Sequence, residues 1–494
     1  METVNLCNYP WIPVAGEKER KSLLQIFADD SASALAGNPV DKIVILRLLL
    51  CIVHASNKIP DLEAWKELST EKIAQNATRY LLEHKECFEL YGKRPFLQFP
   101  KLAEMGGKGN SEASLIVNVA DGNKVILTGW NQYHGISESE KIILLLRSSC
   151  YACGGKKFDK TLSLTKGLVK GATGRCGTLL GFKGYLHAYL KGKNILDTLR
   201  LNILTEEEIR STKAFSAGLG SPFWENMPEN ENGPDAKKYK NSYLGQLFPL
   251  DKFLCLTESG IIKTDGIHYP GHKENLIDPA LNIYSDGKDF KATWAQTEKH
   301  PWRELPAILA FIENKQQTPY FLSMGLYKIK SLSPDEIKIW VGGAEVSSNS
   351  GEQYFSGKND YVESEFSIPT EYIRKIQFGF YKELMQNLDQ TAKRLYACVS
   401  GYYKKLQSDN AQDIAGKATT AFWDILSSHA QKILDLAFSA EKDSEEIKEE
   451  KRFWFNSMCQ VYDEFCPHET PRQIEAWVEA NPRFQHKKSG KEKK

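Results

Sequence analysis

The sequence feature that most constrains the fold is a long amphipathic pattern that begins after Pro369. Between residues 371 and 402, apolar side chains recur at helical spacing, at Ile373, Ile376, Phe380, Leu384, Leu388, Leu395, Val399 and Tyr402. This spacing places the apolar side chains on one face of an α-helix. Because such a face must be covered by another element, we expect further helices to pack against it.

Three more helices are predicted before the C-terminus. Apolar side chains at helical spacing lie within 422–436 and again within 453–465. A last helix begins at Thr470, followed by a proline at its first position and by Gln473, which can complete a capping box. Four antiparallel helices with short connections form a bundle. We therefore predict that residues 366–494 form a C-terminal four-helix bundle with a basic tail.

Residues 1–365 have a different pattern, with short apolar runs and many Gly- or Pro-marked loops. The most apolar stretch, at 39–55, contains an arginine and is too short to cross a bilayer of about 30 Å, so we expect a buried core helix. Strands are predicted at 253–257 and 337–343, and a helix over 185–204. The fold class is therefore α+β, with a large mixed α/β N-terminal domain preceding the bundle.

The overall charge is close to neutral, since 64 basic residues face 63 acidic ones. A polyanionic partner must therefore be met by local segregation of charge. The first residues lack the basic segment and apolar run of a signal peptide. We expect a cytoplasmic protein that does not bind a membrane.

Local charge segregation occurs in residues 151–193. This stretch holds nine basic residues, one acidic residue and nine glycines, so its net charge is +8. Glycine lets a backbone approach a ligand closely, and positive charge attracts a polyanion in a salt-dependent way. The stretch fits a loop that contacts nucleic acid through its backbone and through phosphates. Composition alone also allows a flexible, solvated loop.

Two cysteines at the start of this stretch, Cys150 and Cys153, have the spacing of a zinc knuckle. A structural zinc site needs four ligands, and although Cys176 and His187 could complete a set, neither belongs to a second knuckle. A redox pair would sit where a strand enters a helix, whereas this pair follows a helical run. We therefore interpret the thiols as packing residues and predict no metal site.

Catalytic motifs are missing from the sequence. The glycine-lysine run lacks the spacing of a phosphate-binding Walker loop, and no metalloprotease, nucleophile-elbow or EF-hand pattern occurs. The closest histidine pair, His268 and His272, lies in a Gly/Pro-rich loop. We predict no catalytic residues and no cofactor.

Several stretches in order resemble one known family. They are NLCNYPWIPV (5–14), SLLQIF (22–27), RLLLCIVHA (47–55), RPFLQFP (94–100) and GYLHAYLKGKNILDTLRLNIL (184–204), followed by the helical C-terminal region. This series resembles the large subunit of the type I-E CRISPR Cascade surveillance complex, the CasA/Cse1 family, over essentially the whole chain.

The resemblance implies a non-enzymatic DNA-binding subunit. Such a subunit recognises the protospacer-adjacent motif (PAM) in double-stranded DNA, helps to open the duplex for R-loop formation and supports nuclease recruitment, while guide pairing reads the longer target. The implied partners are PAM-containing DNA, a CRISPR guide RNA, other Cascade subunits, and a helicase-nuclease recruited in trans or a nuclease domain on another subunit.

The resemblance also assigns DNA contacts to particular residues. The family's glycine loop matches Gly154 and Gly155, with Lys156, Lys157 and Lys160 beside it. A lysine that contacts the PAM from a β-hairpin is placed at Lys288 in a separate stretch.

Two further elements are implied. A wedge hairpin whose glutamine tip splits the first base pairs is placed at Gln353 and Tyr354, with Asn349 as an alternative tip. A loop that contacts guide RNA or a neighbouring subunit matches Trp130, Asn131 and Gln132; Trp130 taken alone also fits a core anchor.

Two other functions stay open from the residues alone. One is a zinc-dependent nuclease that uses the cysteines and a histidine. The other is a purely architectural scaffold subunit whose basic loop binds RNA or another subunit.

Overall fold

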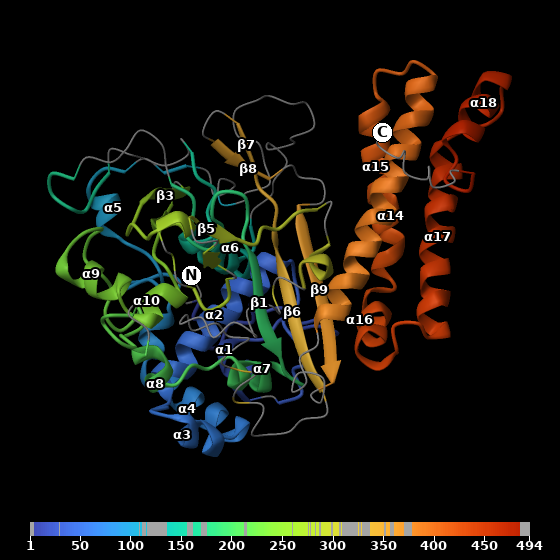
Figure 1. Ribbon diagram of the computed structural model, residues 1–494. Helices are drawn as coiled ribbons and strands as arrows, with labels where there is room; N and C mark the ends of the chain where they lie inside the picture. The colour runs from blue at the N-terminus through green and yellow to red at the C-terminus, as the bar shows by residue number, and fades with distance from the viewer. Residues whose placement is uncertain are drawn as a thin grey trace. The chain divides into compact units, whose positions relative to one another are not determined.

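The computed structural model divides into two compact units, residues 1–297 with 314–365 and residues 298–313 with 366–494 (Figure 1). It describes residues 4–28, 30–107, 109–110, 115, 136–155, 162–168, 175–211, 215–258, 260–274, 276, 278–281, 283–285, 288–297, 300–305, 308, 325, 328, 336–349, 352–355, 360–369 and 378–484.

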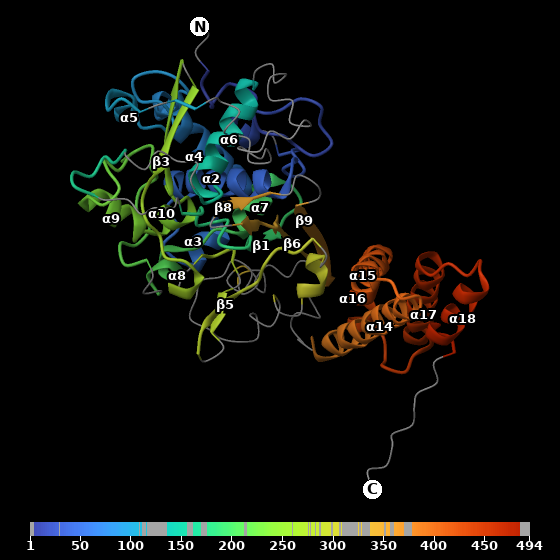
Figure 2. The same ribbon diagram turned by 90° about the horizontal axis from the view of Figure 1, so that it is seen from above.

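The first unit is built around α2 (Pro39–Ser56), which lies beside α6 (Glu138–Cys150) in Figure 2. The helix begins where the side-chain oxygen of Asn38 accepts a hydrogen bond from the backbone N of Asp41 (3.0 Å). It is apolar on nearly all sides, and most of its side chains are buried. The predicted core helix at 39–55 is confirmed.

Shorter helices surround α2, and none of the helices in the described ranges combines the length and apolar character needed to cross a bilayer. The α-helices are α1 (Leu23–Ala28), α3 (Leu62–Glu67), α4 (Thr70–Glu83), α5 (Lys101–Glu104), α7 (Ile195–Leu201), α8 (Glu206–Arg210), α9 (Pro234–Lys240) and α10 (Tyr243–Leu247), and the 3₁₀ turns are η1 (Lys85–Phe88) and η4 (His272–Glu274).

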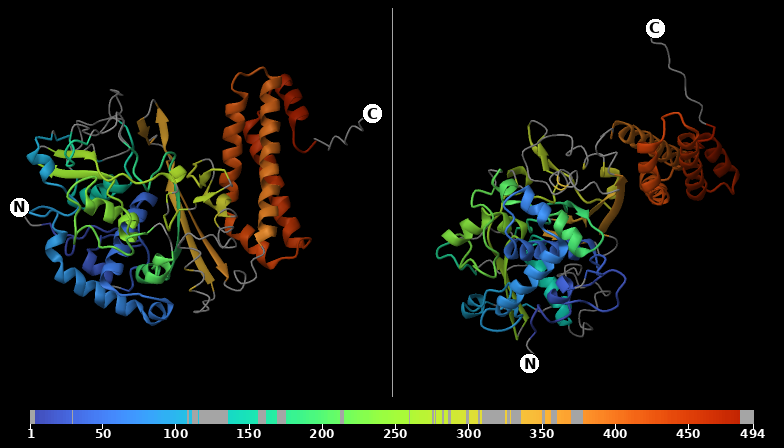
Figure 3. Two further views of the ribbon diagram at one scale, coloured as in Figure 1. Left: turned by 60° about the vertical axis from the view of Figure 1, so that its left-hand side comes forward. Right: turned by 90° about the horizontal axis from the view of Figure 1, so that it is seen from below.

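A three-stranded sheet has the order β1–β6–β9, and its long strands β6 and β9 lie side by side in Figure 3. β1 (Leu186–Lys191) runs antiparallel to β6 (Glu336–Ala344), and β9 (Tyr361–Pro369) forms the other edge. The predicted strand at 337–343 is confirmed. The predicted helix over 185–204 is wrong in its first part, because β1 is a strand and only α7 is helical. A buried apolar run has no period that separates strand from helix, and pairing with β6 decides for the strand.

Three antiparallel hairpins complete the described strands of the first unit. They are β2 (Lys252–Thr257) with β3 (Gly260–Asp265), β4 (Ile283–Ser285) with β5 (Phe290–Ala292), and β7 (Ser347–Asn349) with β8 (Glu352–Tyr354). The predicted strand at 253–257 is confirmed by β2. The β7–β8 hairpin belongs to the connection between the neighbouring strands β6 and β9.

The second unit is helical, and the α+β fold class is confirmed. Residues 378–484, described without a gap, form α14 (Phe378–Lys405), α15 (Ala411–Ser427), α16 (Ala430–Ser439), α17 (Glu445–Phe465) and α18 (Pro471–Ala480). The turn η5 (Pro301–Glu304) belongs to the same unit, where Trp302 packs edge-on against Trp423 of α15.

Two sequence expectations can be compared with these helices. The capping box of α18 is confirmed, since Thr470 Oγ1 accepts from Gln473 N (3.3 Å) and Gln473 Oε1 accepts from Thr470 N (2.9 Å). The second predicted helix divides into α15 and α16 at Ser428 and His429. Neither residue is a helix breaker. The His429 ring stacks on Phe453 of α17 (centroids 3.8 Å apart), so a tertiary contact marks the break.

Candidate nucleic-acid interface

The chain enters the basic, glycine-rich stretch from the end of α6. A capping box of Ser137 and Glu140 begins this helix, which ends at Cys150. Cys150 and Cys153 are buried and form no disulfide, and burial raises the pKa of the Cys150 thiol well above its usual value. A thiol held protonated is a poor metal ligand and a poor nucleophile. Among the described residues no cluster of three His, Cys, Asp or Glu side chains could hold a metal ion.

Gly154 and Gln353 are joined by two reciprocal hydrogen bonds, although they lie 199 positions apart in the sequence. The backbone N of Gly154 donates to Gln353 Oε1 (2.8 Å), and the backbone N of Gln353 donates to Gly154 O (3.1 Å). The predicted glycine loop and the predicted wedge hairpin therefore meet directly. We call the described residues of 150–155, 177–184 and 344–355 the glycine junction.

Two glycines are required by the close approach of backbones within the glycine junction. Gly155 has φ +129°, and a Cβ there would lie 3.2 Å from the Cα of Glu352. Gly184 has φ +91°, and a Cβ there would lie 1.8 Å from the carbonyl oxygen of Ala344. A side chain at Gly184 would thus overlap the backbone that leads from β6 into the hairpin. These glycines serve packing between chain segments.

Gln353 is buried, with 5% of its surface exposed, and it pairs with Ser348 inside the β7–β8 hairpin. Its side-chain Nε2 donates to Gly181 O (3.0 Å) and Phe182 O (2.8 Å), while its Oε1 accepts from Gly154. The sequence predicts a wedge tip at Gln353, whereas the structure buries this side chain. The amide instead clamps two glycine-containing segments to the hairpin, because three long-range backbone partners satisfy it.

The exposed side chains of the glycine junction are neighbours of this clamp. Phe182 is 58% exposed and Tyr354 is 40% exposed, which is unusual for large aromatic residues. Lys183 is exposed as well, and its backbone O accepts from Val346 N (3.1 Å). Aromatic faces can stack on bases and a lysine can meet a phosphate. The sequence does not predict Phe182 as a site residue; its only signal is an aromatic-lysine pair between two glycines of the basic stretch.

A buried ion pair is linked to the glycine junction through His187. Arg47 of α2 forms a bidentate ion pair with Asp278 (2.6 and 2.7 Å), and its Nη2 lies 3.4 Å from His187 Nδ1. Because a guanidinium only donates, Nδ1 must accept, and the proton on Nε2 is donated to Leu179 O (2.8 Å). Burial and the charge of Arg47 lower the pKa of His187 to about 3, so the ring stays neutral.

A second buried carboxyl holds the same turn. Asp251 accepts from the backbone N of Thr178 (2.7 Å) and from its hydroxyl (2.6 Å). Burial raises the pKa of Asp251 to about 7, against the lowering effect of the two hydrogen bonds and of nearby Lys252 and Arg175. The turn at 177–184 is therefore fixed by hydrogen bonds from His187 to Leu179 and from Thr178 to Asp251. Phe182 and Lys183 extend from this hydrogen-bonded turn.

The remaining predicted site residues are placed as follows. Lys288 is exposed between β4 and β5, in a hairpin separate from β7–β8. Asn349 ends β7 and pairs with Glu352, next to the hairpin turn, while its side chain lies outside the described residues. Six predicted residues also lie outside the described ranges, namely Lys156, Lys157, Lys160, Trp130, Asn131 and Gln132.

The cations of the basic stretch differ in their surroundings. Lys191 forms an ion pair with Glu365 (2.5 Å), so its charge is locally balanced. The other described cations of the stretch are exposed, at Lys166, Arg175, Lys183 and Lys193. The charge counted in the sequence is thus partly presented to solvent.

The fold and the site together define a large α+β protein whose glycine junction presents aromatic and basic side chains. The chain belongs to the family described as CRISPR-associated protein Cse1, whose model matches residues 5–462. The family resemblance inferred from the sequence is confirmed. A comparison with curated proteins finds no significant match.

Solved structures with the same fold cover nearly the whole chain. CasA of Thermus thermophilus has a TM-score of 0.71 at 15% identity, covering 97% of this chain and 98% of that chain. Cse1 of Thermobifida fusca has a TM-score of 0.69 at 17% identity, covering 97% and 93%. A chain of a CRISPR RNA-guided surveillance complex has a TM-score of 0.67 at 16% identity, covering 97% and 98%.

Proposed function

We propose that this chain is the large subunit of a type I-E CRISPR Cascade complex, an RNA-guided DNA surveillance assembly in antiviral defence. The observation that carries the proposal is the family match over residues 5–462. The fold shared with a chain of a CRISPR RNA-guided surveillance complex supports assembly with a guide RNA and other Cascade subunits. In this assembly the chain acts by binding, without catalysis of its own.

The glycine junction is the proposed contact with PAM-containing duplex DNA. Lys183 is exposed there, and the chain continues from Gly155 into Lys156, Lys157 and Lys160. Lysines that meet phosphates release counterions, so they supply sequence-independent affinity that falls with salt. Backbone groups and aromatic faces add contacts that depend on groove shape.

Duplex opening is assigned to the exposed aromatics of the glycine junction. Tyr354 follows the buried Gln353, and the carbonyl of Phe182 is held by the same amide. Inserting an apolar side chain between base pairs costs about a few kcal/mol per step, which contacts to the opened strands and guide pairing offset. We therefore assign the wedge to Tyr354 with Phe182 and a positioning role to Gln353.

The other assigned contacts lie elsewhere on the chain. Lys288 would add a second contact to the PAM duplex from its own hairpin. Trp130, Asn131 and Gln132 would contact the guide RNA or a neighbouring subunit. The opened DNA would pass to a helicase-nuclease recruited in trans or to a nuclease domain on another subunit.

The DNA contact is tested by Lys183→Ala in the assembled complex, with Lys193→Ala as a matched control. Both residues are exposed lysines of the basic stretch, but β1 separates them by about 20 Å. Loss of one phosphate contact should lower the slope of log affinity against log salt by about 1 for Lys183→Ala only. Equal slopes for both variants and the wild type would contradict the assignment. Lys156→Ala with Lys157→Ala should lower the slope further.

The wedge is tested by Tyr354→Ala, which leaves the Gln353 clamp in place. We expect PAM-duplex binding to persist while opening, followed by permanganate footprinting of unpaired thymines, becomes slower. An unchanged footprint would remove Tyr354 from the wedge.

The same preparations separate the alternatives. Stoichiometric zinc with cleavage by the isolated chain would favour a zinc-dependent nuclease. Binding of RNA without any preference for PAM duplex would favour an architectural scaffold.

A further inference from the structure

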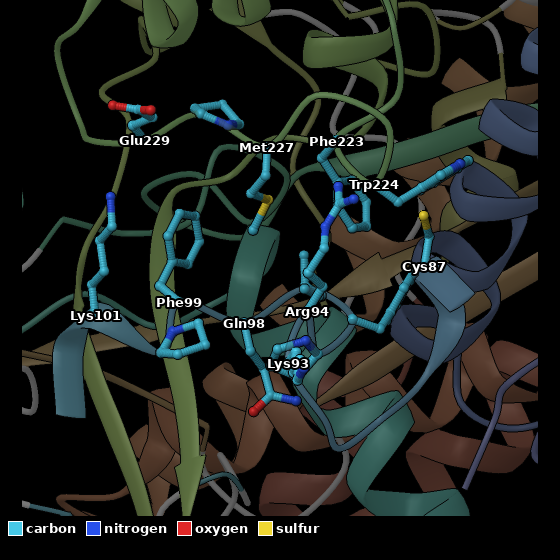
Figure 4. Close-up of a pocket in the computed structure, with 15 residues that line it drawn as sticks. Cys87, Lys93, Arg94, Gln98, Phe99, Lys101, Phe223, Trp224, Met227 and Glu229 are labelled. Carbon is cyan, nitrogen blue, oxygen red and sulfur yellow. The ribbon is translucent and has the colours of Figure 1, made fainter. Parts of the chain in front are cut away.

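A pocket in the first unit lies between residues 93–101 and residues 223–229, two segments far apart in the sequence (Figure 4). Its volume is about 220 Å³. Figure 4 shows Phe99 and Met227 in the middle of the pocket, with Lys101 and Glu229 toward one end and Cys87 and Trp224 toward the other. We call this cavity the Phe99 pocket.

The backbone of the Phe99 pocket is strained at one lining residue. Leu97 is buried yet has φ +60°, a conformation that side chains other than glycine and asparagine rarely adopt. Its neighbour Gln98 holds this geometry, since Gln98 Nε2 donates to Leu90 O (2.7 Å) and Gln98 Oε1 accepts from Leu256 N (2.9 Å). Strained residues of this kind gather at ligand sites, where the surrounding structure maintains them.

The rim of the Phe99 pocket is positively charged. Lys93, Arg94 and Lys101 are exposed, and none of them forms an ion pair with the part of the chain that the structure describes. Glu229 is the acidic lining residue. The rim therefore carries unbalanced positive charge around an apolar floor of Phe99, Met227 and their neighbours.

The volume of the Phe99 pocket and the charge of its rim indicate which kind of ligand it can bind. The volume lies below the roughly 300 Å³ at which pockets for drug-sized ligands begin, so it suits one large apolar side chain. The Gln98 amide is held by backbone groups at both ends, which fixes its orientation and leaves at most one N–H and one oxygen lone pair for a ligand. The cationic rim attracts anionic groups, and carboxylates on either side of that apolar side chain meet this requirement. Residues 487–494 of this chain, KKSGKEKK, are too basic to be the occupant.

We propose that the Phe99 pocket binds an acidic peptide segment of a partner protein. One large apolar side chain of the segment enters the pocket as an anchor, and flanking carboxylates meet Lys93, Arg94 and Lys101. The proposal does not depend on the DNA-binding function.

The test uses the full chain and fluorescence anisotropy with a labelled synthetic peptide, Asp-Glu-Asp-Trp-Glu-Asp-Asp. A matched peptide with alanine in place of tryptophan reports the anchor, and one with glutamine and asparagine in place of the acids reports the charges. We expect the first peptide to bind at least about tenfold more tightly than either control peptide, and more weakly as salt rises.

Two variants locate the site. Lys101→Glu should weaken binding of the tryptophan peptide about tenfold, whereas Lys238→Glu, an exposed lysine on α9, should leave it unchanged. Met227→Trp should block the pocket, with an unchanged far-UV circular dichroism spectrum and melting temperature as the folding check.

Four results would overturn the proposal. They are no binding of the tryptophan peptide at about 1 mM chain, equal binding of the alanine peptide, equal loss in Lys101→Glu and Lys238→Glu, and stronger competition by dAMP than by unlabelled peptide. The last result would assign the pocket to a nucleotide instead.

Discussion

The glycine junction and the helical second unit are built on opposite principles. In the second unit, residues three or four positions apart form each helix, and the apolar stripes then pack together. In the glycine junction, Gly154 and Gly181 are joined through Gln353, which lies 199 and 172 positions away from them. Local pattern therefore specifies the helices, whereas the glycine junction exists only once the chain path has brought distant segments together.

Each region contains a buried polar side chain that shows the same difference. Gln353 is neutral and bonds three backbone groups on two other segments. Glu450 of α17 is 1% exposed and bonds side chains, namely Trp454 one helical turn away (3.0 Å), Lys432 (2.8 Å) and His429 (3.1 Å). Removing either group should cost stability, but only Gln353 holds backbones in register.

The largest effect is expected for Gly184→Ala. Its Cβ would overlap Ala344 O, so the free energy of unfolding should fall by more than about 4 kcal/mol. Gly218→Ala is the control, because φ is also positive (+68°) but nothing lies within 4 Å of the added carbon; it should cost about 1 kcal/mol. Urea unfolding measures both. Equal losses of stability in the two variants would mean that the positive φ, and not the close approach to Ala344, explains the need for glycine at position 184.

Gln353→Ala should lower the free energy of unfolding by about 3 kcal/mol, since it leaves the buried N–H of Gly154 and the buried carbonyl of Gly181 without partners, together with the partly buried carbonyl of Phe182. The adjacent Tyr354→Ala, at an exposed position, should cost less than about 1 kcal/mol. Thermal unfolding of both variants gives the comparison. A loss at Tyr354 as large as at Gln353 would contradict the clamp.

Glu450→Ala should cost about 2 kcal/mol, because the buried indole N–H of Trp454 loses its acceptor while the exposed Lys432 regains water. Glu449→Ala, exposed and adjacent, should change stability by less than about 0.5 kcal/mol. The urea midpoint followed by tryptophan fluorescence reports both variants. If Glu450→Ala left the stability unchanged, apolar packing between the helices would be enough to hold the second unit together.

The last effect depends on pH and concerns Asp251, which holds Thr178 of the glycine junction. The pKa of Asp251 is raised from 3.8 to about 7, so the folded chain holds a proton that the unfolded chain releases between these values. Asp251 therefore stabilises most below pH 4, and this contribution is lost as pH rises through 7. The pKa values of His54 and His187 are lowered to about 3 in the folded chain. The contribution of these histidines to stability therefore rises with pH between about 3 and 6.5, opposite to that of Asp251.

Asp251→Asn isolates this contribution, because the amide stays neutral at every pH. We expect the melting temperature of the variant, relative to wild type, to rise between pH 5 and pH 8. A difference independent of pH would show that Asp251 titrates near its ordinary value.

Particular residues show how far sequence reasoning reaches. The α+β class, the core helix α2 and the capping box at Thr470 were predictable, since each depends on neighbours within a few positions. The sequence of β1 predicts a helix, because a strand buried against β6 has no hydrophobic period of its own.

The site was predictable as a stretch but not as a set of exposed side chains. Nine glycines and a charge of +8 singled out residues 151–193. Their composition cannot say that Gly154 faces the protein interior, that Gln353 is buried or that Phe182 is exposed. Burial depends on which segment covers a residue, and here the covering segments come from far along the chain.

The sequence by itself thus determined the family, the helical C-terminal region and the stretch that carries the charge, because these depend on residue order and local spacing. Only the tertiary structure decided that the side chain of the predicted wedge residue Gln353 is buried, and that Tyr354, Phe182 and Lys183 are among the side chains presented to solvent. The physical reason is that a buried amide needs hydrogen-bond partners, and those partners become its neighbours only when the chain folds.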